Sequence, residues 1–202
     1  MSHQPLTVEP SGASVVALNV QSMGLTDEQF DKLCHENPEL RIELTSKGEL
    51  IIMPPTGMKT GWRNSILNHR LVEWTERDGS GFAFDSSTLF TLADGSKRSP
   101  DASWIRREKV ENLSVREQEG FAAITPDFVV ELCSPSDSWR LLQEKMLDYM
   151  RNGVQLGWLI DPQKKCAHMY RPAQPLITLE SPASLTGDPI LPGFVFNPQE
   201  IW

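Results

Sequence analysis

Cysteine is scarce in this chain, and long apolar runs do not occur. The 202 residues include 3 cysteines, Cys34, Cys133 and Cys166, which lie far apart and form no CxxC pair. Such spacing argues against a disulfide framework and against a structural zinc site. No apolar run approaches the ~20 residues that span a bilayer, and the first residues lack the basic and apolar regions of a signal peptide. We therefore expect a soluble protein of the reducing cytoplasm that has no membrane partner.

Positive charge is also in deficit. The chain has 19 lysines and arginines against 27 aspartates and glutamates, and its net charge is -8. An overall positive field that attracts nucleic acid is therefore excluded. Any role in binding nucleic acid must rest on a local basic patch, for which the candidates are Lys97-Arg98, Arg106-Arg107 with Lys109, and Lys164-Lys165. Such short basic stretches also occur in solvated turns and at helix ends.

The composition predicts one folded domain. Hydrophobic residues make up 39% of the chain, and its 13 glycines and 15 prolines are scattered, which is typical of a globular core and not of disorder or repeats. A chain of this length favours a single core over two. Residues 1–24 contain several prolines and glycines without helical periodicity, so we expect an N-terminal extension there and one domain over 25–202.

Local patterns in the first half predict a peripheral helix, a hairpin and a core helix. A capping box over residues 26–29 begins a helix that Pro38 stops. Two apolar runs, 40–44 and 49–53, are separated by a turn and predict a β-hairpin. Apolar residues at three- and four-residue steps then predict an amphipathic helix over about 57–79.

The middle of the chain predicts a second pair of strands. Residues 82–92 and 100–105 are rich in strand formers. Asp94-Gly95 between them is a strong turn pair, so a hairpin or meander is expected. The charged stretch over 106–119 favours either a short helix or a loop.

The second half predicts a βαβ unit. The run 127–132 is typical of a buried central strand, and a helix follows it, capped by Ser136 or Ser138 and ending near Gly153. A further strand over 155–160 could lie parallel to the first. Additional short strands are expected over 166–171, 176–180 and 194–196. Together the patterns predict an α/β fold with a mixed central sheet flanked by helices.

Two acidic residues occupy unusual positions in the predicted strands. Asp101 follows Pro100 at the start of one strand, and Glu131 lies near the end of a very apolar one. A buried carboxylate costs several kcal/mol unless a cation, a metal or hydrogen bonds compensate it. Two carboxylates that converge at strand ends provide the oxygen ligands that Mg²⁺ or Mn²⁺ prefers. The structural alternative is that Asp101 caps a turn and Glu131 pairs with an arginine.

Lys145 borders the apolar face of the helix that follows this strand. It lies three residues after Leu142 and four before Tyr149. A lysine at such a place can extend into water or toward the sheet edge where Glu131 ends. In an isolated helix the solvated arrangement would be favoured. The nearby Asp101 and Glu131 favour the arrangement in which Lys145 faces the sheet.

The order and spacing of several blocks resemble the Uma2 family, which is common in cyanobacteria and is similar to the PD-(D/E)xK nucleases. The resemblance covers about residues 40–171. Its blocks are SPDASW (99–104), PDFVVELCSPSD (126–137), Lys145 with Tyr149, Gly153-Val154, WLIDP (158–162) and, earlier in the chain, GEL (48–50), MPPTG (53–57) and FDSST (84–88).

The resemblance implies a restriction-endonuclease-like fold with an extra N-terminal helix and β-hairpin. It implies that Asp101 and Glu131 bind the metal. Cys133 occupies the usual position of the catalytic lysine, and Lys145, on the following helix, matches the lysine of Uma2-like sequences. Glu43 is implied as a further acidic site residue, although a solvated or hairpin-pairing role is an alternative.

The activity implied by the resemblance is hydrolysis of phosphodiester bonds in DNA by an endonuclease that depends on Mg²⁺ or Mn²⁺ and could act as a homodimer. The basic stretches Lys97-Arg98 and Arg106-Arg107 flank the strand that carries Asp101 and are predicted to guide the phosphates. Two alternatives stay open. The fold could serve as a non-catalytic nucleic-acid-binding or regulatory module, which Cys133 favours, or the carboxylates could act on another phosphate ester.

Overall fold

The computed structural model describes residues 15–202 and shows a mixed α/β architecture, as predicted. Most strands belong to two sheets. The five-stranded sheet has the order β1 (Val16–Asn19), β3 (Glu49–Met53), β2 (Arg41–Leu44), β6 (Lys97–Arg98) and β5 (Phe90–Thr91). The six-stranded sheet has the order β11 (Ile177–Glu180), β10 (Cys166–Tyr170), β9 (Leu156–Asp161), β8 (Phe128–Leu132), β7 (Ala102–Arg106) and β4 (Gly81–Asp85).

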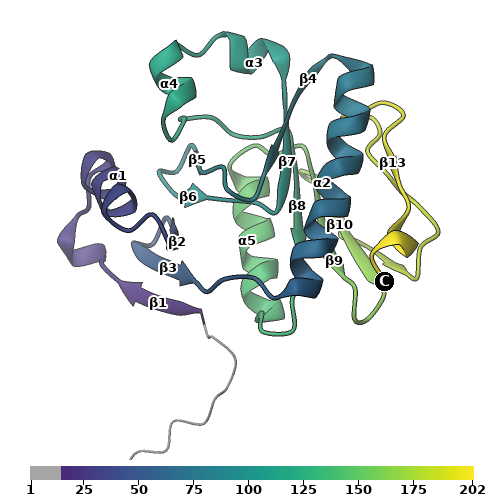
Figure 1. Ribbon diagram of the computed structural model, residues 1–202, viewed down its shortest axis with the longest axis horizontal. Helices are drawn as coiled ribbons and strands as arrows, with labels where there is room; N and C mark the ends of the chain where they lie inside the picture. The colour runs from purple at the N-terminus through teal and green to yellow at the C-terminus, as the bar shows by residue number, and fades with distance from the viewer. Residues whose placement is uncertain (1–14) are drawn as a thin grey trace, which may run out of the picture.

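Five α-helices, two short 3-10 helices, η1 (Gln21–Met23) and η2 (Pro198–Glu200), and a short C-terminal ribbon complete the described part of the chain. The helices are α1 (Asp27–Glu36), α2 (Met58–Asp78), α3 (Arg107–Glu111), α4 (Val115–Glu119) and α5 (Trp139–Arg151), and the ribbon is β12 (Leu185–Thr186) with β13 (Val195–Phe196). Figure 1 shows the purple N-terminal region with α1, β2 and β3 at one side of the molecule, and α2 with the yellow C-terminal segment at the other. No helix in the described residues is long and apolar enough to cross a membrane.

The predicted βαβ unit is confirmed and forms the centre of the larger sheet. β8 and β9 are parallel, with Val130 opposite Trp158, and α5 connects them. β7 pairs antiparallel with β8, which makes the sheet mixed. Because side chains alternate along a strand, the residues of β8 pack in two hydrophobic cores, one on each face of the sheet. Val130 packs in the core that contains residues of α2, whereas Val129 packs in the core that contains residues of α5.

Two helix boundaries follow the signals in the sequence. The capping box at α1 is present, with the Thr26 side chain accepting from the backbone N–H of Gln29. At the end of α2, Gly79 has a φ of 73°, a left-handed conformation that favours glycine. The expected helices over residues 26–38 and 57–79 are therefore confirmed, and the hairpin between them is β2 with β3.

The prediction of one strand over 82–92 is wrong. The segment divides into β4 and β5, which belong to different sheets. Asp85 causes the division, because its carboxylate accepts hydrogen bonds from the backbone N–H and the hydroxyl of Ser87 and turns the chain. The turn at Asp94-Gly95 joins β5 to β6, and not the two long strands that we expected.

The N-terminal region contributes a strand that the sequence did not predict. β1 pairs antiparallel with β3 along the edge of the smaller sheet, and its four side chains are exposed. Because the strand has no buried face, it carries no hydrophobic alternation that the sequence could reveal. The first part of the predicted extension, residues 1–14, lies outside the described residues.

The two sheets are joined by a short link that decides where the candidate site lies. β6 ends at Arg98 in the smaller sheet and β7 begins at Ala102 in the larger one. The intervening residues, Ser99 to Asp101, therefore lie at the junction of the sheets. β8 runs antiparallel to β7, so its final residues return to the same junction.

Candidate active site

A cleft of about 590 Å³ opens at the junction of the two sheets. Its walls are β2 and β3, the first turn of α2, the loop that follows β8, and α5. Asp101, Glu131, Glu43 and Lys145 all line this cleft. The structure thus brings together residues that lie up to 102 positions apart in the sequence.

Glu131 meets α5 at the end of β8. Its position on the strand places it on the same side as Val129, which packs in the core that includes α5. Lys145 Nζ lies 2.8 Å from Glu131 Oε1, and the Tyr149 hydroxyl donates to the same oxygen at 3.0 Å. Lys145 therefore faces the sheet, and the buried Tyr149 packs in the core and also binds the carboxylate.

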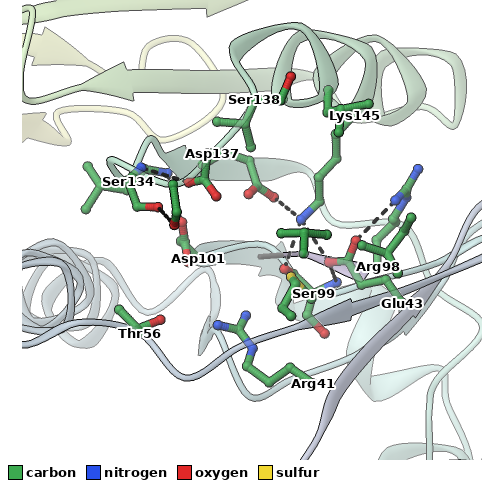
Figure 2. Close-up of a pocket in the computed structure, with 18 of the residues that line it drawn as sticks. Arg41, Glu43, Thr56, Arg98, Ser99, Asp101, Ser134, Asp137, Ser138 and Lys145 are labelled. Carbon is green, nitrogen blue, oxygen red and sulfur yellow. Dashed lines mark hydrogen bonds and ion pairs between the residues drawn. The ribbon is translucent and has the colours of Figure 1, made fainter. Parts of the chain in front are cut away.

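Glu43 enters the site from the smaller sheet. Its Oε1 accepts from Lys145 Nζ at 2.8 Å and from the backbone N–H of Ser99 at 2.9 Å, and its Oε2 accepts from Arg98 Nη1 at 3.1 Å. Arg98 also pairs with Asp148 at 2.8 Å. Figure 2 shows Lys145 reaching down from α5 to this group of residues. Glu43 is 1% exposed, so the solvated role is wrong.

Asp101 is held in place by three residues from two elements, β8 and α2. Its Oδ2 accepts from the backbone N–H of Leu132 at 2.9 Å, which ties it to the end of β8. From α2, Asn64 Nδ2 donates to Asp101 Oδ1 at 3.1 Å, and Asn68 Nδ2 donates to the Asp101 carbonyl at 2.9 Å. The two asparagines are one helical turn apart, so both side chains lie on the same face of α2 and can reach the same residue.

The three carboxyl groups differ in their electrostatics. Burial, together with the negative charges of Asp101 and Glu43, raises the pKa of Glu131 to about 7 against the opposing charge of Lys145. Burial also raises the pKa of Asp101, although the Leu132 N–H and the charges of Lys145 and Arg41 oppose it. For Glu43, burial is outweighed by Lys145 and Arg98, and the pKa is lowered.

The ammonium of Lys145 stays protonated in this surrounding. Burial lowers its pKa, but Glu131 and Glu43 outweigh burial and the pKa lies above its usual value. The lysine is therefore a fixed positive charge and a hydrogen-bond donor. It is poorly suited to remove a proton.

The residues present fit a divalent cation of the Mg²⁺ type. Asp101 and Glu131 are close enough for the charge of one to raise the pKa of the other, a repulsion that a cation between them would relieve. Both protein contacts of the Glu131 carboxylate in residues 15–202 fall on Oε1. The buried Asn64 Oδ1, another hard oxygen, has no hydrogen-bond partner among the described residues.

The number of protein ligands would be small. No group of three or more His, Cys, Asp or Glu residues with metal-binding geometry occurs in the described part of the chain. Mg²⁺ commonly binds through one or two carboxylates and completes its shell with water and substrate phosphate oxygens. The pair Asp101 and Glu131 matches that pattern better than it matches a closed structural site.

The predicted phosphate rim at Lys97 and Arg98 is wrong. Lys97 is 2% exposed, pairs with Asp27 at 2.9 Å and donates to Thr91 Oγ1. The Arg98 side chain is 6% exposed and pairs with the two carboxylates described above. Both side chains form ion pairs within the protein, because β6 is an inner strand of the smaller sheet.

Arg106 and Arg107 lie at the other end of β7, away from Asp101. Arg106 Nε binds Asp127 at 3.1 Å, and Lys109 Nζ binds the same carboxylate at 2.9 Å. Arg107 donates to the Gly79 carbonyl and pairs with Glu111. Neither arginine lines the cleft. The sequence had placed them near the site because they flank the same strand, but they flank its opposite end.

Sequence reasoning missed several residues that contact the site. Asp148 lies three residues after Lys145 on α5, and this spacing could have revealed it. Asn64 and Asn68 share a helix face, but nothing in the sequence says that this face meets Asp101. Arg41 lies two residues before Glu43 and shares its face of β2, a signal that strand alternation supplies.

The fold is of the restriction-endonuclease-like class, and two carboxylates and a lysine meet in its cleft. The model of the Uma2 family, described as a putative restriction endonuclease, matches residues 27–199. This match covers most of the chain, and the protein therefore belongs to the Uma2 family.

A solved structure agrees with this assignment. The chain is similar to a crystal structure from Anabaena variabilis, described as a putative nuclease belonging to DUF820, with a TM-score of 0.69 and 23% sequence identity over 81% of this chain and 90% of that chain. The likeness confirms the predicted fold. No curated protein sequence matches the chain.

Proposed function

We propose that this protein is a nuclease that requires Mg²⁺ or Mn²⁺ and hydrolyses phosphodiester bonds in DNA. The observation that supports the proposal most strongly is the ion pair between Lys145 and Glu131 at 2.8 Å, beside Asp101 and in a cleft. Through this ion pair, α5 places an ammonium beside two carboxylates. The ammonium thus comes from the helix, while position 133, where the usual motif has lysine, holds a cysteine. Membership of the Uma2 family supports a nuclease-like activity in general.

The roles of the residues follow from their surroundings. Asp101 and Glu131 would hold the divalent ion, which would supply an activated water and positive charge for the phosphate. Lys145 is protonated and buried, so it can donate hydrogen bonds to the attacking water or to a phosphate oxygen as negative charge develops there. Glu43 holds the ammonium in place, since it binds Lys145 without contacting Asp101.

The acidity of the chain is compatible with this activity. The site contains several carboxylates, and these contribute to the net charge of -8. A divalent ion reverses the local sign at the point where a phosphate must approach. Phosphate binding would then depend on the ion and on cations within the cleft, and not on the overall field of the protein.

The second candidate function is a nucleic-acid-binding or regulatory module without catalysis. The observation that favours it is Cys133, at the position where the usual motif has lysine. Burial raises the pKa of this thiol to about 12, so it offers neither an ammonium nor a thiolate. The Lys145 ion pairs oppose this alternative, because they provide the charge that Cys133 lacks.

A cleavage assay separates the two candidates. Fluorescent single-stranded and double-stranded oligonucleotides are incubated with the full chain and Mg²⁺, Mn²⁺ or a chelator. We expect cleavage that requires the metal and is lost in Asp101→Asn, while Glu76→Gln, which neutralises an exposed carboxylate of α2 outside the cleft, serves as the control. Binding of Mn²⁺ by calorimetry should be lost in the same variant. Metal-independent binding without cleavage of any substrate would favour the module.

The predicted homodimer belongs to the same proposal. A small acidic protein that binds DNA weakly as a monomer gains affinity when two sites act together. Sedimentation of the full chain with and without an oligonucleotide measures the oligomeric state. A monomer under both conditions would contradict the prediction without affecting the assignment of the cleavage residues.

A further inference from the structure

Arg41 is a cleft residue to which the proposed chemistry assigns no role. It begins β2 two residues before Glu43, and alternation along the strand places both side chains on the face that lines the cleft. Ile42, between them, is 5% exposed and packs in the opposite core with Phe30. The strand is therefore fixed by its apolar face, and Arg41 is directed into the site.

The guanidinium of Arg41 differs from the other cations of the site. Arg98 and Lys145 each pair with two carboxylates. Arg41 forms no ion pair with an acidic residue of the described chain, and its hydrogen bond there runs from Nη2 to the Ser86 carbonyl at 3.0 Å. Most of its donors therefore remain available, while the Ser86 bond limits the freedom of the side chain.

The position of this charge is specific. Figure 2 shows the guanidinium extending from β2 toward Asp101. Its charge opposes the rise in the pKa of Asp101 that burial causes, which is consistent with a short separation. A cation beside the metal-binding aspartate, but not neutralised by it, faces the place where an anionic group of the substrate would lie.

We propose that Arg41 binds the phosphate group that is positioned at Asp101 for hydrolysis. This inference rests on the proposed nuclease function. A planar guanidinium can donate two parallel hydrogen bonds to phosphate oxygens, which an ammonium cannot do. Lys47 and Lys59 also line the cleft, but they are more peripheral and have no comparable anchor to the fold. Arg41 is the preorganised member of the set.

The first test measures DNA binding without turnover. Affinity of an oligonucleotide is measured with Ca²⁺ over a range of salt concentrations for the wild type, Arg41→Ala and Arg41→Lys. We expect Arg41→Ala to lower affinity about ten- to hundredfold, with Arg41→Lys intermediate. The slope of log affinity against log salt concentration should fall in Arg41→Ala by about the amount that one phosphate contact contributes. The control is Arg77→Ala, an exposed arginine near the far end of α2 that makes the same change of charge.

The second test replaces DNA with a small phosphate ester and, like the first, does not depend on cleavage. Deoxythymidine 3′,5′-bisphosphate is titrated into the wild type and both variants in the presence of Ca²⁺, and circular dichroism checks that each variant is folded. Binding that is lost in Arg41→Ala and partly restored in Arg41→Lys would support the inference. Equal affinity in wild type and Arg41→Ala, or no binding to the wild type, would overturn it.

The two tests distinguish failure of the inference from failure of the proposed function. If the wild type cleaves DNA and Arg41→Ala cleaves and binds it equally well, the nuclease assignment holds and the role of Arg41 is wrong. If the bisphosphate binds in an Arg41-dependent manner but no nucleic acid is cleaved with Mg²⁺ or Mn²⁺, the phosphate site holds and the nuclease assignment is wrong.

Discussion

Two buried carboxylates lie near the two ends of strand β8, and the charged groups around them differ. Asp127 and Glu131 are 2% and 4% exposed, and they lie four residues apart, which is about 13 Å along a strand. Asp127 binds Arg106, Lys109 and the backbone N–H of Arg106. Glu131 shares Lys145 with Glu43 and lies beside a further carboxylate, Asp101.

The difference shows how burial alone fails to mark a functional residue. At the Asp127 end, cations outnumber the carboxylate, and hydrogen bonds satisfy both of its oxygens. At the Glu131 end, burial raises the pKa of Glu131 to about 7, with the negative charges of Asp101 and Glu43 contributing to the rise and Lys145 opposing it. The first arrangement stabilises the fold, and the second leaves negative charge for a ligand to compensate.

The largest expected effect comes from the lysine at the Glu131 end. Lys145→Met should lower the rate of DNA cleavage by about 100-fold or more, because it removes a positioned charge and donor. Lys109→Met, the matched change at the Asp127 end, should leave the rate within about twofold. Single-turnover cleavage of one oligonucleotide measures both. Equal losses in the two variants would abolish the functional distinction between the two ends.

A pH effect is expected at the Glu131 end. Protons compete with the metal for Glu131, so Mn²⁺ affinity should fall by about tenfold per unit as the pH drops below about 7, the raised pKa of this carboxyl. Calorimetry between pH 5.5 and 8.5 measures this slope, and Glu131→Gln should bind weakly at every pH. A flat profile in the wild type would show that Glu131 is not a ligand.

The same pKa has a consequence for stability in the metal-free protein. The folded chain retains a proton on Glu131 that the unfolded chain releases, so the free energy of unfolding should decrease as the pH rises from about 4.5 to about 7. Added Mn²⁺ should offset this decrease at pH 7 and above. Urea unfolding with and without the metal measures the effect. Glu131→Gln should lack the pH-dependent contribution.

A smaller effect on stability is expected at the Asp127 end. Asp127→Ala leaves the Arg106 N–H without its acceptor, and should lower the free energy of unfolding by about 1–3 kcal/mol. Arg106 and Lys109 are 41% and 36% exposed, so water can solvate their released charges and limit the cost. Urea unfolding measures the change. Loss of Mn²⁺ binding in the folded variant would contradict the separation of the two ends.

The smallest expected effect is at Cys133. Cys133→Ser should change cleavage by less than about twofold, because the thiol is buried, its pKa is raised to about 12, and its nearest polar contact is the Ser134 carbonyl. The cleavage assay used for Lys145→Met measures it. A loss comparable to that of Lys145→Met would mean that position 133 still takes part in the chemistry.

The sequence by itself determined several local elements and singled out the two carboxylates of the candidate metal site. The capping box of α1, the glycine after α2 and the apolar run of β8 act within a few residues, so their structural effect can be predicted without knowledge of distant neighbours. Asp101 and Glu131 were recognisable because a charge in an apolar strand needs compensation, whatever provides it.

Only the tertiary structure decided which charges meet. Lys145 and Glu43 are 102 residues apart, and their contact depends on how β2 of one sheet packs against a helix that covers the other. The sequence assigned Lys97, Arg98 and Arg106 to a phosphate rim, because a basic pair looks the same in a solvated turn, an inner strand or an ion cluster. Burial and the partner across the sheet distinguish these cases, and both arise from contacts between segments that no local pattern records.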